Sequence, residues 1–239
     1  MLKTTELIGF GARAAMIAAA PVTAINFLAG GSDLTEDVST HTVTLDLGTA
    51  VAGSKIVVLA AHANWTGSNV AITTMDFDGT TSLVDTGVSE SSSGHGFVEG
   101  WYYDDTGGII GGSTDINTDT TSKQQMHTIV AYRLTGAVTG GPTTSDTTTG
   151  ATTHTFSLNT TTNSLLLGIS NQRSGTDYSA TWSGVTSLAK DFENVASSSY
   201  NNTTAGILVA SGETPAAPVC TWSSGGIRGR ALMMTWDEA

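Results

Sequence analysis

Five histidines are the side chains of this sequence best suited to proton transfer or to binding a transition metal. They are His41, His62, His95, His127 and His154. Their spacing forms no HExxH motif and no pair two residues apart, so it predicts neither a metal site nor a catalytic histidine. No G-x-S-x-G nucleophile elbow occurs among the many Ser and Thr residues. The single cysteine, Cys220, excludes an intrachain disulfide and a cysteine-based zinc site.

Two pairs of carboxylates, Asp76 with Asp78 and Asp104 with Asp105, could supply oxygen ligands to calcium, a hard cation. The ligand ladder and the closing Glu of an EF-hand loop do not follow them. Because Gly79 comes directly after Asp78, we interpret this dipeptide as a turn. Two carboxylates across a cleft could also hydrolyse a glycosidic bond. The 21 acidic residues leave this hydrolase as a remote alternative that no motif supports.

Exposed aromatic rings could bind sugars by stacking. Most of the five Trp residues fall in expected strands with the phase of core residues, which favours packing. Trp65 follows an expected strand end and is the best candidate for an exposed ring. The candidate glycan-binding residues are therefore Trp65, Trp101 and Tyr102.

The composition indicates which elements must position these side chains. Of 239 residues, 41 are Thr and 28 are Gly, and only 13% are charged, which is typical of strands and turns. With 9 basic and 21 acidic residues the net charge is −12. Nucleic-acid binding is not expected, because phosphate contacts need clustered Lys and Arg. The glycine-rich segment 107–112 opens no helix after a strand, so we interpret it as a flexible loop.

Alternating or short apolar segments, separated by turn residues, predict about eleven strands. They cover residues 40–47, 55–63, 70–77, 97–103, 126–134, 152–158, 164–170, 178–182, 205–210, 219–222 and 229–236. The connections are short, which predicts antiparallel sheets.

The two halves of the chain resemble each other in four segments that occur in the same order. Residues 40–45 are similar to 153–158, and residues 54–59 to 164–169. The segment 77–83 is similar to 182–188, and each half ends in a strand with a late aromatic residue, Tyr132 or Trp236. His41 and His154 are equivalent in this repeat, which favours a structural role for both.

These patterns predict an all-β protein: an antiparallel, jelly-roll-like β-sandwich built from two related halves. The sandwich would span residues 34–239, with repeats at about 38–136 and 151–239. We expect each half to give strands to both sheets of one closed core. Two small separate domains are the alternative, with residues 139–149 as the only plausible linker.

Residues 1–33 are expected to form an arm ahead of the sandwich. The Ala-rich stretch 13–20 could form a short helix that stops before Pro21. We expect the arm to dock on a neighbouring subunit, and packing on its own domain is the simpler alternative. The candidate anchoring residues are Leu7, Ile8, Phe10, Met16 and Ile17.

A secretory signal is the rival interpretation of this segment, with Lys3 as its basic region and cleavage near residue 24. Glu6, Gly9, Gly11 and Arg13 interrupt the apolar run and argue against it. No stretch approaches the roughly 20 apolar residues of a membrane-spanning helix. No membrane partner is therefore expected.

Several short motifs resemble those of one known family of proteins. They are INFLAG at 25–30, LGTA at 47–50, KIVV at 55–58, Trp101-Tyr102, AYRLTG at 131–136, LLLG at 165–168 and TWSGVT at 181–186. The pattern is similar to β-sandwich structural proteins encoded by tailed bacteriophages and prophages, and it covers about residues 25–236. Where many relatives have a Gly-Gly pair at the first turn, this chain has Asp78-Gly79.

The resemblance implies a non-enzymatic virion protein without cofactors, and it supplies no catalytic residues. The expected role is a capsid decoration or head-fibre protein exposed on the particle and anchored by its arm. A tail fibre, or a receptor- or glycan-binding module of the virion, is the alternative. Expected partners are major capsid or tail proteins, further copies of the chain in a homo-oligomer such as a trimer, and, for the alternative, a host surface glycan.

Overall fold

The computed structural model describes the chain from residue 23 to residue 239, except residues 37, 65–69, 93–95, 138, 151, 174–177, 198–199, 210–216 and 225–226. Within these residues the secondary structure consists of strands β1 to β17, with no helix. All pairings between these strands are antiparallel. The structure thus confirms the expected all-β, antiparallel sandwich architecture.

The first half of the chain forms two sheets that pack face to face. The first inner sheet has the spatial order β1 (Ala24–Asp33), β9 (Met126–Thr135), β3 (Ser54–Ala63), β7 (Gly96–Asp105) and β6 (Val84–Ser92). The first outer sheet has the order β2 (Val38–Asp46), β8 (Ser113–Gln124), β4 (Ile72–Phe77) and β5 (Thr81–Ser82).

The second half repeats this arrangement. The second inner sheet has the order β10 (Thr144–Gly150), β17 (Ile227–Trp236), β12 (Ser164–Arg173), β15 (Tyr200–Val209) and β14 (Lys190–Ser197). The second outer sheet has the order β11 (Thr153–Thr155), β16 (Val219–Trp222) and β13 (Ala180–Ser183).

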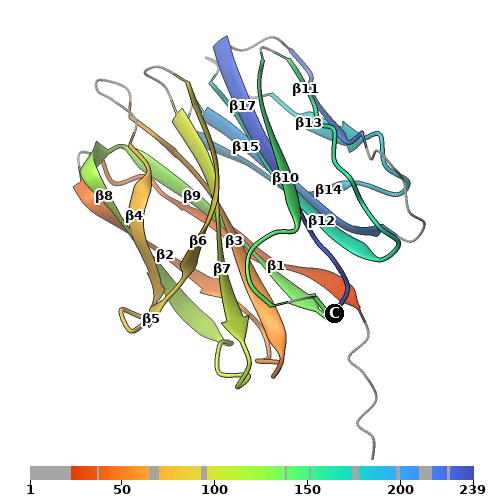
Figure 1. The fold of residues 1–239 in the computed structure, drawn as a ribbon. Helices are drawn as coiled ribbons and strands as arrows, with labels where there is room; N and C mark the ends of the chain where they lie inside the picture. Colours follow the sequence, from red (N-terminus) through yellow and green to blue (C-terminus); the bar gives the residue numbers. More distant parts are fainter. Residues whose placement is uncertain are drawn as a thin grey trace, which may run out of the picture.

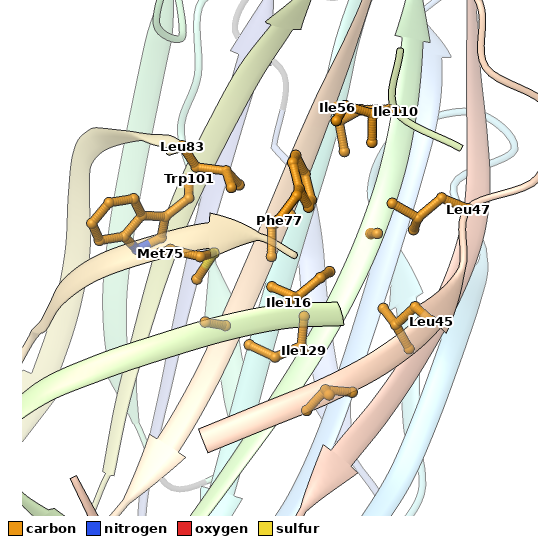
Figure 2. Close-up of a cluster of buried hydrophobic side chains, with 14 of the residues drawn as sticks. Leu45, Leu47, Ile56, Met75, Phe77, Leu83, Trp101, Ile110, Ile116 and Ile129 are labelled. Carbon is orange, nitrogen blue, oxygen red and sulfur yellow. The ribbon is translucent and has the colours of Figure 1, made fainter. Parts of the chain in front are cut away.

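The four sheets are stacked as four layers with three apolar cores between them (Figure 1). The first core lies between the outer and inner sheets of the first half and includes Ile116 and Ile56 (Figure 2). The second core lies between the two inner sheets and brings Leu59 together with Leu167. The third core, around Trp182, lies between the sheets of the second half.

The inner strands are apolar along most of their length because both of their faces are covered. In β3, Ile56 and Val58 belong to the first core, whereas Val57 and Leu59 belong to the second. Every residue of β3 is buried. In the outer strand β2, burial alternates with exposure from His41 onward. This difference explains why residues 56–61 form an unbroken apolar run while residues 40–47 alternate.

Each sheet takes all its strands from one half of the chain, which differs from the expectation that each half would give strands to both sheets. The two halves are not independent either, because their inner sheets share the second core. Each inner sheet has an apolar face that is turned away from the outer sheet of its own half. The other half of the chain covers this face and shields it from water.

The four similar segments of the sequence fall on strands that hold equivalent places in the two halves. They lie on β2 and β11, on β3 and β12, at the ends of β4 and β13, and on β9 and β17. In both halves the chain crosses repeatedly between the inner and outer sheet in the same order. The structural repeat also includes β1 and β10, which lie at matching edges and pair with the last strand of their half.

This equivalence changes the meaning of two segments. Residues 24–33, expected to belong to the arm, form the sheet strand β1. Residues 144–150, which overlap the expected linker 139–149, form the corresponding strand β10. Residues 1–22, including the Ala-rich stretch, lie outside the described residues.

The turn expected at Asp78-Gly79 joins β4 to β5. Both residues have a positive φ, 53° and 70°. The N–H of Thr80 donates to the carbonyl of Phe77 at 3.0 Å. Two successive residues with positive φ suit a tight hairpin turn, which Asp-Gly adopts readily.

The shared second core generates a stability prediction. Replacing the buried Leu167 in Leu167→Ala should lower the free energy of unfolding by about 2–5 kcal/mol, because it removes contacts of both inner sheets. The matched change Leu34→Ala, at a residue 50% exposed, should cost less than about 0.5 kcal/mol. Denaturant unfolding followed by circular dichroism measures both. Equal losses in the two variants, or separate transitions for the two halves, would contradict the shared core.

Candidate functional site

The structure describes only part of the candidate residues chosen from the sequence. The five candidate anchoring residues, Leu7, Ile8, Phe10, Met16 and Ile17, lie outside the described residues, and so does Trp65. Their proposed roles stay predictions. Trp101 and Tyr102 are both described, on β7.

The Trp101 side chain is buried, with 4% of its surface exposed, and it belongs to the first core. It points into the space between the first outer and inner sheets (Figure 2). A sugar cannot reach this ring, so the structure removes Trp101 from the glycan-binding candidates. The sequence placed it correctly in a strand but did not show which of its two faces was covered.

Tyr102 points to the opposite face of β7 and is half-buried. The Lys55 ammonium lies 4.6 Å from the centre of its ring, within the range of a cation–π contact. Burial, and then the nearby Asp104 carboxylate, raise the pKa of the Tyr102 hydroxyl. Tyr102 therefore remains a partly accessible ring that already has a cationic partner.

The carboxylates considered as calcium ligands accept hydrogen bonds from the protein itself. Asp76 accepts from the Gly79 N–H at 2.7 Å, and Asp78 accepts from the Asp115 N–H at 2.8 Å. Asp104 accepts from the Lys55 ammonium and from a backbone N–H. These contacts support the interpretation of Asp78-Gly79 as a turn.

Among the residues that the structure describes, no group of three or more His, Cys, Asp or Glu side chains has an arrangement that could hold a metal ion. No helix there is long and apolar enough to cross a membrane.

At the lower end of the first half in Figure 1, buried charges tie two loops together. Arg133 on β9 donates to the carbonyls of Leu47 at 3.2 Å and Ile110 at 2.8 Å. Asp105 accepts from the N–H groups of Ile109 at 2.8 Å and Ile110 at 3.1 Å. Loops 47–53 and 106–112 therefore depend on side chains from the inner sheet.

The glycine-rich segment expected to be a flexible loop packs closely against residues 48–52. A Cβ atom at Gly108 would lie 2.6 Å from the backbone nitrogen of Ala52, and one at Gly111 would lie 2.6 Å from that of Ala50. These glycines serve a close approach of two backbones.

The most unusual group of titratable side chains lies at the opposite end of the first half. His41 on β2, His62 on β3 and His127 on β9 form a cluster that we call the histidine stack. The His41 and His127 rings are stacked with centroids 4.0 Å apart, and the His62 and His127 rings are 4.9 Å apart. All three side chains are buried. Phe97 extends the stack, 5.0 Å from His62.

Only the two outer members of the stack have a carboxylate partner. His41 Nδ1 lies 3.1 Å from Asp33 Oδ2, and His62 Nε2 lies 2.8 Å from Glu99 Oε1. Burial lowers the pKa of His41, and Asp33 opposes that effect. Burial, and then the neighbouring His62 and His41, hold the pKa of His127 well below its ordinary value. The central ring is therefore neutral at pH 7.

Strand phase accounts for this convergence. His41 shares the inward phase of Val43, His62 that of Ala60, and His127 that of Ile129. His62 and His127 are also direct cross-strand neighbours. The alternation of residues along a strand indicates which face each histidine shares, but the sequence does not show which strands are neighbours. It therefore gave no indication that the three histidines form a cluster. His154, the repeat equivalent of His41, is also buried, in the second half of the chain.

Comparison with known proteins adds little to this geometry. No protein-family model matches the chain, and no curated protein matches it. Among solved structures, one similar chain is a peptide-N(4)-(N-acetyl-β-D-glucosaminyl) asparagine amidase, with 8% sequence identity and a TM-score of 0.25. The match covers 90% of this chain and 97% of the amidase, but at this TM-score it carries no argument about fold or function.

The buried loop contacts make the structural role of Asp105 testable. Asp105→Ala should lower the free energy of unfolding by about 2–4 kcal/mol, because two N–H groups lose their acceptor beside the buried Arg133. The control Asp85→Ala removes an exposed carboxylate that accepts from the Gly87 N–H. It should cost about 1 kcal/mol or less. Similar midpoints for the two variants in urea unfolding would show that Asp105 does not hold the loop.

Proposed function

We propose that this protein is a non-enzymatic structural component of a bacteriophage virion. Its role would be that of a capsid decoration or head-fibre protein, exposed on the particle and anchored by its amino-terminal segment. The observation that carries the proposal is the repeated strand order of the two stacked sandwiches.

That order supports a jelly roll in each half. In the first half, β1, β9, β3 and β7 lie side by side, and β2, β8, β4 and β5 lie side by side in the opposing sheet. The second half has β10, β17, β12 and β15 facing β11, β16 and β13. Jelly rolls are used by viral capsid and lectin domains, which fits a virion protein.

The motifs behind the resemblance to phage proteins support the same conclusion. INFLAG lies on β1, KIVV on β3, AYRLTG at the end of β9, and LLLG on β12. These strands belong to the two inner sheets, so the resemblance concerns the framework of the protein. No catalytic residue is implied by any of these segments.

The outer face of the first outer sheet is suited to solvent without salt bridges. Thr40 donates to Asp119 at 2.6 Å, and Thr42 donates to Asn117 at 2.8 Å. Both Thr residues and Asp119 are exposed. The net charge of the whole chain, −12, also suits the exterior of a particle, away from packaged DNA.

The position of residue 23 indicates which end of the protein would face the particle. The Thr23 hydroxyl donates to Glu238, and β1 then runs from Ala24, opposite Thr135, to Asp33, opposite His127. The anchoring segment would therefore meet the particle at the end that carries Glu238. The histidine stack lies at the other end and would face outward. In this arrangement the partners are capsid or tail proteins and further copies of the chain.

Removal of residues 1–22 tests the anchoring. The cut keeps Thr23 and all of β1, so the variant should fold with an unchanged melting temperature but should not incorporate into particles. Incorporation is measured by quantitative immunoblotting of purified particles, and immunogold labelling of intact virions locates the full-length protein on head or tail.

A second pair of variants keeps the chain at full length. Replacing Leu7, Ile8 and Phe10 with Ser should abolish incorporation, whereas Thr4→Ser with Thr5→Ser should leave it unchanged, because only the first set removes apolar surface. Normal incorporation of the truncated chain would overturn the anchoring role. Absence of the full-length protein from virions would overturn the virion proposal.

A further inference from the structure

The histidine stack lies at one end of the interface between the first outer and first inner sheets, which we call the seam. His41 comes from the first outer sheet, whereas His62 and His127 come from the first inner sheet. In the middle of the seam the two sheets are held together by aliphatic and aromatic side chains such as Leu45 and Phe77. At the end that carries the stack, three buried histidines take the place of these apolar side chains.

We propose that the histidine stack is an acid-sensitive contact that releases β2 and the adjoining part of β8 from the first inner sheet. The inference does not depend on the proposed virion function. It rests on the number of rings, their burial and the groups that face them.

The central ring has no place for a second proton. An imidazolium needs an acceptor for both of its N–H groups, whichever tautomer precedes it. His127 Nδ1 lies 2.8 Å from the Thr118 hydroxyl, but His127 Nε2 is buried with no hydrogen-bond partner among the described residues. A proton on Nε2 would thus create a buried, unpaired charged donor, which is costly.

The charged groups around the stack do not relieve this cost. Asp33 from β1 is paired with His41. Glu99 from β7 is paired with His62 and also accepts the Ile72 N–H at 2.9 Å. From β8 the central ring meets Thr118, a neutral side chain.

Polar side chains also lie on the other face of the first inner sheet at this end. Arg230 on β17 donates to Asn171 at 3.3 Å within the second inner sheet. Residue Thr128, next to His127 on β9, points to that face and accepts from Asn202 at 2.9 Å. Protonation of His41 would add a like charge beside His127 without adding an anion.

The direction of the pH effect follows from these contacts. In the closed seam the pKa of His127 lies well below 6.5, whereas in the opened seam water restores the ordinary value. Closure is fully favoured above about pH 6.5 and weakens as the pH falls. Each pH unit below that value shifts the equilibrium toward the open form by about tenfold for every ring that protonates only when exposed.

Hydrogen–deuterium exchange on the full chain, corrected for intrinsic rates, measures this opening. Between about pH 7 and pH 5, protection of β2 should fall at least about tenfold more than protection of β12 in the second inner sheet. His127→Phe keeps an aromatic ring in the stack but cannot be protonated there, so its β2 protection should fall clearly less than that of the wild type. His154→Asn, at the repeat equivalent of His41, should retain the wild-type loss.

Two results would overturn the proposal: β2 protection that does not depend on pH, or an equal loss in His127→Phe. If that variant does not fold, nitrogen-15 NMR of the histidine rings in the unmodified protein gives the answer. The His127 ring should stay neutral while β2 is protected and become protonated as protection is lost. A protonated His127 in fully protected protein would rule the acid-sensitive contact out.

Discussion

Burial of both faces of two inner sheets is the constraint on which the rest of this structure depends. β3, β9, β12 and β17 have few positions facing water, so each half must cover the outside of the other's inner sheet. Small residues allow this approach. A Cβ atom at Gly100 would lie 2.4 Å from the Met234 side chain, and one at Gly206 would lie 2.7 Å from the Ile25 side chain of the other half. The repeat is therefore a physical requirement as well as a sequence pattern, because one half alone would leave an apolar sheet exposed.

Polar side chains gather where the inner strands approach the end of the stack of sheets. His127 and Thr128 are neighbours on β9 and point to opposite faces. His127 joins the histidine stack, whereas Thr128 accepts from Asn202, which in turn accepts from Asn171 at 2.5 Å. Buried polar groups of this kind are stable only when they are partnered. Each ring of the histidine stack departs from this rule at one nitrogen, because His41 Nε2, His62 Nδ1 and His127 Nε2 have no hydrogen-bond partner among the described residues.

Strands with a clear apolar pattern were predicted from the sequence, and strands without one were missed. Residues 55–63 and 126–134 match β3 and β9 closely. β8 was missed because its inward positions include Thr114, Thr118 and Thr120, so polarity does not alternate along it. β1, β6, β10 and β14 were missed because they are edge strands with many polar or glycine residues. An edge strand is defined mainly by backbone pairing on one side, so its side chains need not follow an apolar pattern.

The sequence by itself determined the all-β class, the antiparallel pairing, the related halves and the turn at Asp78-Gly79. These features depend on local propensity and on a period of two, which a linear pattern carries. Only the tertiary structure decided that each half builds its own pair of sheets, that Trp101 faces the core, and that three histidines far apart in sequence share one stack. Those outcomes depend on strand register and on which sheet covers which face, and both are set by contacts between residues distant along the chain.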